Sequence, residues 1–299
     1  GGPAHRAAVL RGAAARHQAA GHGLRRGRSA GRRGLCDAPA RSAELGDLAL
    51  ECAERALALA PNPAEAHAAQ GWAIGQYRVD DAGSERHLRR AIELKPSYAM
   101  ARYVWGMAAC ALRRFDEALR YAESAVELDP LSMVAHRGVA YVWFARGDLA
   151  RAREHVLQAQ DLAPRAAFAT YLHGLIESEA GNTELGVTLL HRAIAQSGGR
   201  WPFVEGFIAY YQARAGDTEA AEAAEQRLRQ VDPPNHMALA LTALGRRDTS
   251  VAIQQLELAA RDHDPFLVHI ADHPPFTQLR ADPIAHPLYR RLNLPVGGD

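Results

Sequence analysis

Apolar and polar positions recur along the chain in units of about 34 residues. Alanine and leucine fill most apolar positions while Val, Ile and Thr are sparse, which favours helices over strands. Four stretches end alike: ALALAP at Pro61, AIELKP at Pro96, AVELDP at Pro130 and AQDLAP at Pro164. These prolines are spaced by 35, 34 and 34 residues. Such self-similarity predicts a repeat architecture.

Three further stretches continue the series with small changes. AIAQSGG at 193–199 replaces the proline with Gly198 and Gly199, and RQVDPP at 229–234 and ARDHDP at 260–265 follow with altered lengths. The repeat is therefore expected to extend to about residue 265. The sixth unit, near 236–260, is expected to have a shortened first helix.

Small residues occupy the same offsets in the units 97–130, 131–164 and 165–198. They are Gly106, Ala118 and Ala125; Ala140, Ala152 and Ala159; and Gly174, Gly186 and Ala193. Between the first two positions of each unit lies a predicted turn. Gly147, Gly181 and Gly216 suit a left-handed helix end, and Asp148, Asn182 and Asp217 can begin the next helix. Each unit is thus predicted to be two helices that cross closely.

This arrangement resembles the tetratricopeptide repeat (TPR) family over residues 47–265. The small residues that match are Gly71, Gly106, Ala118, Ala125, Ala152, Ala159, Gly174 and Ala193, with a closing proline at 96, 130 and 164. The family's early tryptophan and mid-hairpin tyrosine are largely absent, although Trp105 and Trp143 lie nearby. The resemblance implies an all-α, right-handed superhelix of about six helical hairpins. One hairpin cannot bury its apolar face alone, so neighbours must cover it.

The last part of the chain, 266–299, is expected to be a short cap of helical pieces broken by prolines. Its motifs are DPF at 264–266, PPFTQLRADP at 274–283 and RRLNLP at 290–295. They resemble the closing segment of bacterial TPR regions that follow a TolB-like region, a winged-helix regulator or a class III adenylate cyclase domain. His286 and Pro287 depart from the aromatic residue usual in that stretch, which leaves the subfamily open.

The resemblance also implies an inner face lined by the first helix of each hairpin. The predicted binding groove consists of aromatic and apolar residues with a single basic one: Trp72, Tyr103, Met107, Arg137, Tyr141, Phe144, Phe168, Tyr171 and Tyr210. Such a groove suits a protein or peptide segment with apolar or aromatic anchors. Two alternatives stay open: the rings pack inside a tight superhelix, or an upstream domain of the same chain occupies the groove.

Charge is unevenly distributed. Residues 1–44 hold nine of the 35 basic residues and two of the 34 acidic ones, together with many glycines and alanines. This segment is expected to be disordered or aberrant because it can bury little apolar area. A processed or mistranslated origin, a basic tail for nucleic acid or membrane, and a targeting peptide remain alternatives. The rest of the chain is mildly acidic, so no nucleic acid is expected to bind to residues 45–299.

Catalytic and metal motifs are not apparent in the sequence. Phosphate-binding loops, nucleophile elbows, His-Glu-x-x-His and Cys-x-x-Cys are missing, so we expect no enzyme activity, no cofactor and no metal. His263, His269, His273 and His286 gather near the end, and His269 and His273 have ligand spacing only if that stretch is helical. Ordinary polar packing is the favoured interpretation because Pro274 and Pro275 interrupt a helix there.

Three scattered cysteines and no long apolar run predict a cytoplasmic protein without a visible membrane segment. Together these observations predict a non-catalytic protein-interaction module. We expect it to be the C-terminal sensor or scaffold region of a larger bacterial signalling or transcription-regulatory protein. The alternative is the regulatory region of an enzyme, an adenylate cyclase or kinase, whose catalytic domain lies outside these residues.

Overall fold

The computed structural model describes residues 39–59, 63–75, 80–231, 234–262, 264, 266–270 and 272–297. Within these ranges all regular structure is helical. The helices are α2 Pro39–Leu59, α3 Ala64–Ala73, α4 Asp81–Leu94, α5 Ala99–Ala111, α6 Phe115–Leu128, α7 Met133–Arg146, α8 Leu149–Leu162, α9 Ala167–Glu179, α10 Thr183–Ser197, α11 Pro202–Arg214, α12 Thr218–Arg229, α13 His236–Gly245, α14 Thr249–Arg261, the 3-10 helix η2 Leu267–Ile270, α15 Pro274–Ala281 and α16 His286–Arg291.

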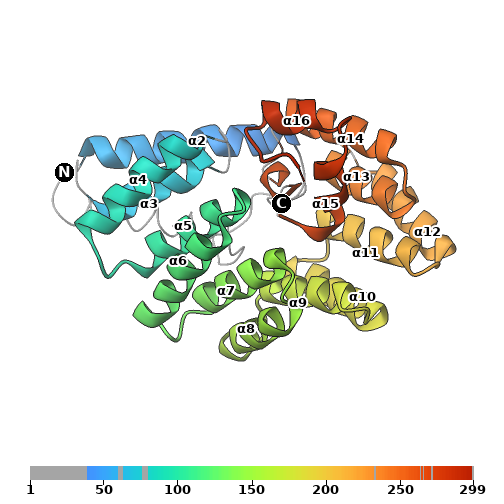
Figure 1. Ribbon diagram of the computed structural model, residues 1–299, viewed down its shortest axis with the longest axis horizontal. Helices are drawn as coiled ribbons and strands as arrows, with labels where there is room; N and C mark the ends of the chain where they lie inside the picture. Colours follow the sequence, from blue (N-terminus) through green and yellow to red (C-terminus); the bar gives the residue numbers. More distant parts are fainter. Residues whose placement is uncertain are drawn as a thin grey trace, which may run out of the picture.

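Successive helices pack as antiparallel hairpins that stack side by side (Figure 1). The pairs run from α3 with α4 to α13 with α14, and the first helix of each hairpin also touches that of the next. A stack of this kind buries the apolar face of each hairpin against its neighbours. The expected all-α solenoid is confirmed, and it curves around the C-terminal elements.

The repeated small residues lie where the two helices of a hairpin approach most closely. A Cβ atom on Gly106 would lie 3.1 Å from the carbonyl oxygen of Ala118, and one on Gly174 would lie 3.0 Å from that of Gly186. Ala118 and Ala125 are fully buried beside them. The predicted role of these positions is confirmed, because larger side chains there would separate the helices.

The turns between the paired helices follow the predicted chemistry with one exception. Gly147, Gly181 and Gly216 adopt φ values of 92°, 88° and 88°, the left-handed region that glycine favours. The carboxylates of Asp148 and Asp217 accept hydrogen bonds from N–H groups in the first turn of α8 and α12. Asn182 precedes α10 but makes no such cap. Its side chain instead donates to Glu177, because a buried carboxylate lies within reach.

Two boundaries can be compared with the sequence expectation, and one of them differs from it. Helix α2 begins at Pro39, before residue 45 where the solenoid was expected to start, and proline is well accommodated in a first helical turn. Residues 1–38 of the segment 1–44, which was expected to be disordered or aberrant, lie outside the described residues. Helix α13 has 10 residues against 13 in α11, so the predicted shortening of the sixth hairpin is confirmed.

One buried carboxylate links three elements in the middle of the solenoid. Glu177 on α9 has a side chain only 4% exposed, and it accepts two hydrogen bonds from Arg153 on α8, at 2.6 and 2.8 Å. Burial alone would raise its pKa, but the bonds from Arg153 and Asn182 hold the pKa of Glu177 below its usual value. A buried carboxylate is tolerated when paired in this way.

Replacing Arg153 by alanine is expected to lower the free energy of unfolding by about 1–2 kcal/mol, because it leaves Glu177 without its bidentate partner while Arg153 itself is partly solvated. Arg55→Ala is the control, since Arg55 pairs with Glu51 on the exposed side of α2, and it should cost under about 0.5 kcal/mol. Urea titration measures both. The difference between the stability losses of the two variants should vanish as the pH falls through the lowered pKa of Glu177, because the carboxylate then takes up a proton. Equal losses at neutral pH would contradict this role.

The C-terminal elements do more than cover the last hairpin. Helix α16 lies beside α14, whereas η2 and α15 lie on the concave side of the stack (Figure 1). Phe276, Leu279 and Tyr289 are fully buried in this region, and Tyr289 donates to the carbonyl oxygens of Ile270 and Phe276. Residues 264–281, which we name the return segment, therefore belong to the core of the molecule. The expectation of a simple cap is incomplete.

Candidate binding surface on the inner face

Aromatic residues recur on the first helices of consecutive hairpins. Tyr141 lies on α7, Tyr171 on α9, and Phe203 and Phe207 on α11. The ring of Tyr171 is 6.5 Å from that of Phe203 and 5.9 Å from that of Phe207. Because the first helices lie side by side, residues about one repeat apart form a continuous aromatic row. Of the residues in this row, Tyr141 and Tyr171 belong to the predicted groove.

The return segment covers this row. Phe266 stacks on Phe203 with ring centroids 4.6 Å apart and an interplanar angle of 21°. The ring of His273 lies 5.5 Å from both Tyr141 and Phe207. His273 is 1% exposed. The chain therefore places a segment of its own on the inner face.

Hydrogen bonds join the same residues. The Tyr141 hydroxyl donates to Oδ1 of Asp272 at 2.8 Å and lies 2.8 Å from Nδ1 of His269. Nδ1 of His273 lies 3.1 Å from the same Asp272 oxygen, and Nε2 of His273 lies 3.0 Å from the Tyr171 hydroxyl. Rings and hydroxyl groups of the inner face thus hold the segment together, which suits tyrosine in such surfaces.

The protonation states follow from burial and these partners. Burial opposes ionisation of Asp272, but hydrogen bonds from His269 and His273 hold its pKa well below the usual range. Burial also lowers the pKa of His273 and raises the pKa of Tyr141 and Tyr171 well above their usual value. At neutral pH the cluster therefore contains a carboxylate, a neutral His273 ring and protonated tyrosines.

A different part of the predicted groove carries Arg137. The guanidinium of Arg137 lies 5.6 Å from the ring of Tyr103 and 5.7 Å from that of Phe168, and it donates to the Tyr103 hydroxyl. Arg137 and Phe168 are half-buried. Cation–π stacking holds the guanidinium in place while part of it stays accessible.

The predicted groove residues therefore fall into distinct environments. Phe144 is buried beside His273, at a ring distance of 6.1 Å. Met107 is half-buried and lies near the position of Gly138, whereas Tyr210 contacts the ring of Tyr211 in an edge-to-face arrangement near the end of α11. Trp72, on α3, is also half-buried. The structure brings Tyr103, Arg137 and Phe168 together in one group and Tyr141, Phe144 and Tyr171 in another.

Residues of the C-terminal tail complete this surface, which the sequence pattern did not predict. Asp272 and Phe266 were not predicted as part of it, and the histidines were assigned to ordinary packing. One signal was present: Phe266, Leu267, Ile270, Phe276 and Leu279 are too many apolar residues for a polar cap. Within the described residues, His269, Asp272 and His273 also form the group whose donor atoms lie close enough to hold a metal ion, within 4.8 Å of one another.

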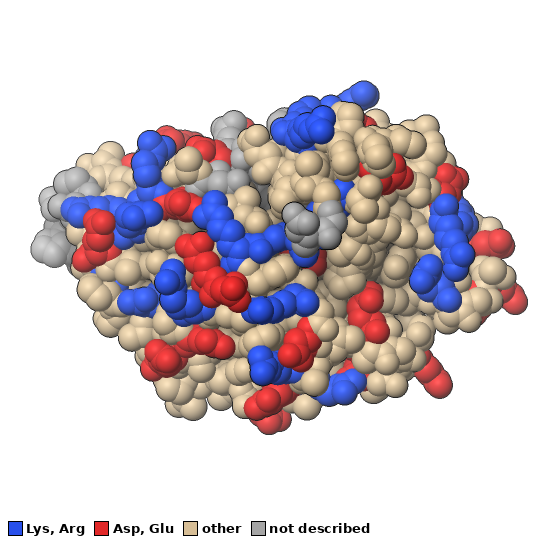
Figure 2. Space-filling model, in the orientation of Figure 1, with Lys and Arg blue, Asp and Glu red and all other residues tan. Residues whose placement is uncertain are grey.

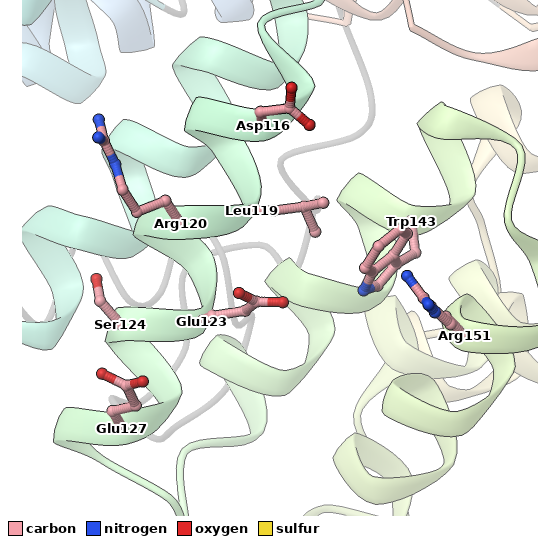
Figure 3. Close-up of a pocket in the computed structure, with 8 residues that line it drawn as sticks. All are labelled: Asp116, Leu119, Arg120, Glu123, Ser124, Glu127, Trp143 and Arg151. Atoms are coloured by element: carbon pink, nitrogen blue, oxygen red, sulfur yellow. The ribbon is translucent and has the colours of Figure 1, made fainter.

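An open hollow lies away from this surface, between the second helices of two hairpins (Figure 3). It is lined by Asp116, Leu119, Arg120, Glu123, Ser124 and Glu127 of α6, with Trp143 of α7 and Arg151 of α8 on its other side. The guanidinium of Arg151 lies 4.4 Å from the Trp143 ring. Its mixed charges and shallow form distinguish it from the aromatic inner face.

Charged side chains are intermixed on the face shown in Figure 2. Basic and acidic residues alternate over α4 to α8, and a continuous basic band is not seen on that face of the described residues. None of the helices in the described ranges is both long and apolar enough to cross a bilayer.

Comparison with known proteins gives the fold. No family model matches the sequence, and no curated protein does. Among solved structures, PilF of Pseudomonas aeruginosa is 17% identical, with a TM-score of 0.51 over 66% of this chain and 90% of that chain. PilW, a type IV pilus biogenesis factor, is 15% identical, with a TM-score of 0.51 over 73% and 93%.

A third solved structure covers more of the chain. The hetero-tetramer Cut9–Hcn1 of APC/C is 14% identical, with a TM-score of 0.59, and the match spans 85% of this chain but only 47% of that one. At these identities the similarity establishes the architecture alone. The chain has the fold of TPR-type helical solenoids.

Proposed function

We propose that this chain is a non-catalytic protein-interaction module that binds a protein segment with apolar or aromatic anchors on its inner face. One observation carries the proposal: the inner face already holds a peptide segment, through Phe266 stacked on Phe203 and through the hydrogen bonds that this segment forms with Tyr141 and Tyr171. A surface that seats one segment by ring contacts and hydroxyl groups has the chemistry to seat another.

The part of the groove available to a partner is the group around Arg137. Arg137 and Phe168 are half-buried, and Arg137 Nε has no hydrogen-bond partner although that atom is buried. A bound segment with an aromatic ring could stack on this group, and a carbonyl or carboxylate could accept from the guanidinium. Aromatic and arginine residues dominate the energetics of such interfaces.

We predict that peptides selected on the full-length chain from a display library will be enriched in aromatic residues. Arg137→Ala and Phe168→Ala should each weaken their binding about tenfold or more, because they remove the two accessible members of the stack. Fluorescence anisotropy measures the affinity, and far-UV circular dichroism checks that helicity is retained.

Leu131→Ala serves as the control, since Leu131 is an aliphatic residue, 79% exposed, in the loop before α7. It should leave binding unchanged. Selected peptides that bind all variants equally would show that they use another surface, and the proposed groove would then be wrong.

We also propose that the module is the sensor or scaffold region of a larger bacterial signalling or regulatory protein of the cytoplasm. The PPFTQLRADP motif supports the origin in a bacterial regulatory protein, and the free thiols of Cys52 and Cys110 are consistent with the cytoplasm. Sequencing the reading frame upstream tests the proposal: a regulator domain would support it, and a cyclase or kinase domain would favour the regulatory region of an enzyme instead.

A further inference from the structure

Four donor atoms from two distant parts of the chain converge beside α7. They are Oη of Tyr141, Nδ1 of His269, Oδ1 of Asp272 and Nδ1 of His273. Tyr141 Oη lies 2.8 Å from the His269 and Asp272 atoms and 3.1 Å from that of His273. The Asp272 oxygen lies 3.5 Å from His269 Nδ1 and 3.1 Å from His273 Nδ1.

These separations are close to those of ligands around a tetrahedral ion. With metal–ligand distances of about 2.0–2.1 Å, neighbouring ligand atoms lie about 3.3 Å apart. Four of these five separations, from 2.8 to 3.1 Å, are shorter than that value by up to about 0.5 Å, and the fifth, 3.5 Å, is slightly longer. The three side chains of the return segment can therefore meet one ion with little movement, and the Tyr141 hydroxyl occupies the fourth corner.

The charge in this place also favours a cation. Asp272 is 1% exposed and forms ion pairs with the rings of His269 and His273, and the Arg113 guanidinium also interacts with it electrostatically. A buried carboxylate is costly unless a positive charge or a metal compensates it. Two imidazoles and one carboxylate form a donor set typical of zinc-class ions.

The surroundings resemble those of a built metal site. Nε2 of His273 lies 3.0 Å from the Tyr171 hydroxyl, which can accept its proton and fix the ring while Nδ1 faces the centre. The rings of Phe144 and Phe207 exclude water on the inner side. His269 has a side chain 26% exposed, which leaves a path for an ion to enter.

We propose that His269, Asp272 and His273 bind a divalent transition-metal ion of the zinc class, with Tyr141 at the fourth position. The ion would be structural: it would fasten the return segment to α7 and neutralise the buried carboxylate. This inference concerns the return segment alone and does not depend on what the Arg137 group binds.

The test uses the full-length, tag-free chain after dialysis against a chelator. Calorimetric titration with Zn²⁺ should show one equivalent bound, and Co²⁺ should give the visible absorption of a tetrahedral site that Zn²⁺ then abolishes. Saturating Zn²⁺ should raise the melting temperature by about 5 °C. His269→Ala and Asp272→Asn should each abolish the single equivalent, and Tyr141→Phe should weaken it about tenfold.

His67→Ala is the matched control. His67 and His87 form a second close pair, with Nδ1 atoms 3.1 Å apart, and a metal bound there would be unrelated to the return segment. This variant should bind Zn²⁺ like the unaltered chain. The proposal is overturned if the unaltered chain binds no Zn²⁺, which would leave a purely hydrogen-bonded cluster. It is equally overturned if His67→Ala, and not His269→Ala or Asp272→Asn, loses the ion.

Discussion

Replacing Gly186 by alanine is expected to lower the free energy of unfolding by about 2–3 kcal/mol. A Cβ atom at this position would lie 2.0 Å from Oγ of Ser178 and 2.8 Å from both the Gly174 carbonyl oxygen and the Ser178 backbone nitrogen. The serine hydroxyl can rotate away, but two backbone atoms cannot, so α9 and α10 must separate. Overpacking of this kind typically exceeds the gain in helix propensity from replacing glycine. Denaturant titration gives the loss.

Gly106→Ala tests whether the separation of backbones is the cause. The nearest atoms to its added Cβ would be the Ala118 carbonyl oxygen at 3.1 Å and the backbone nitrogen and Cβ of Ala122 at 3.2 and 3.3 Å, contacts that a shift of a few tenths of an ångström relieves. Because alanine is also the better helix former, this variant should stay within about 1 kcal/mol of the unaltered chain. A Gly186→Ala variant as stable as Gly106→Ala would contradict the close crossing of α9 and α10.

The second large effect is a gain in stability. Asp264 is the first residue of the return segment and is 7% exposed, and burial raises its pKa to about 6, although the backbone N–H of Phe266 donates to it at 2.9 Å. The folded chain therefore binds the Asp264 proton more tightly than the unfolded chain. The contribution of this proton to the stability of the folded chain is complete below the ordinary aspartate pKa, and it is lost as the pH rises through the raised pKa of Asp264.

Asp264→Asn should consequently raise the free energy of unfolding at pH 8 by about 2–3 kcal/mol, because it removes a buried negative charge and keeps an oxygen to accept from Phe266. The gain should shrink below pH 5. Urea titrations across pH 4.5 to 8 measure it. Asp282→Asn is the control: Asp282 also precedes a proline and accepts from the N–H of Ile284 at 2.9 Å, but near the surface. A loss of stability in Asp264→Asn at pH 8 would contradict the assignment.

The repeat architecture could be predicted from the sequence because its causes are local and recur. Small residues at fixed offsets specify where the helices cross, and Gly147 and Gly181 adopt the left-handed conformation that ends a helix. A closing proline follows two residues after the last helical residue of α6 and α8. Each feature depends on neighbours within one hairpin, which periodicity reveals.

The path of the return segment could not be predicted in the same way. Its contacts join positions far apart in the chain, such as Tyr141 and Asp272, which are 131 residues apart. These contacts occur once in the chain, so they cannot be predicted from a pattern that repeats every 34 residues. Pro274 and Pro275 correctly indicated that a long helix does not continue here, yet η2 and α15 bring the histidines together without one.

The surroundings of the aromatic residues could not be predicted from the sequence. Tyr141 and Tyr171 were expected on the inner face, and the sequence could not distinguish a free groove from one packed by the chain itself. The structure shows an intermediate arrangement, with the rings near His273 covered and the group around Arg137 partly accessible. The predicted binding role of the latter group remains a proposal.

The hydrogen bond between Tyr141 and Asp272 also has a consequence for biosynthesis. A ribosome makes the hairpins in order, and each can dock on the one before it as it emerges. The rings of α7, α9 and α11 nevertheless stay uncovered until the return segment is made, and their partners lie 131 positions after Tyr141 and 102 positions after Tyr171. Until the return segment has been translated, the aromatic rings of the nascent solenoid are exposed to solvent. A premature stop codon before residue 264 would make that transient state permanent, with aggregation as the foreseeable outcome.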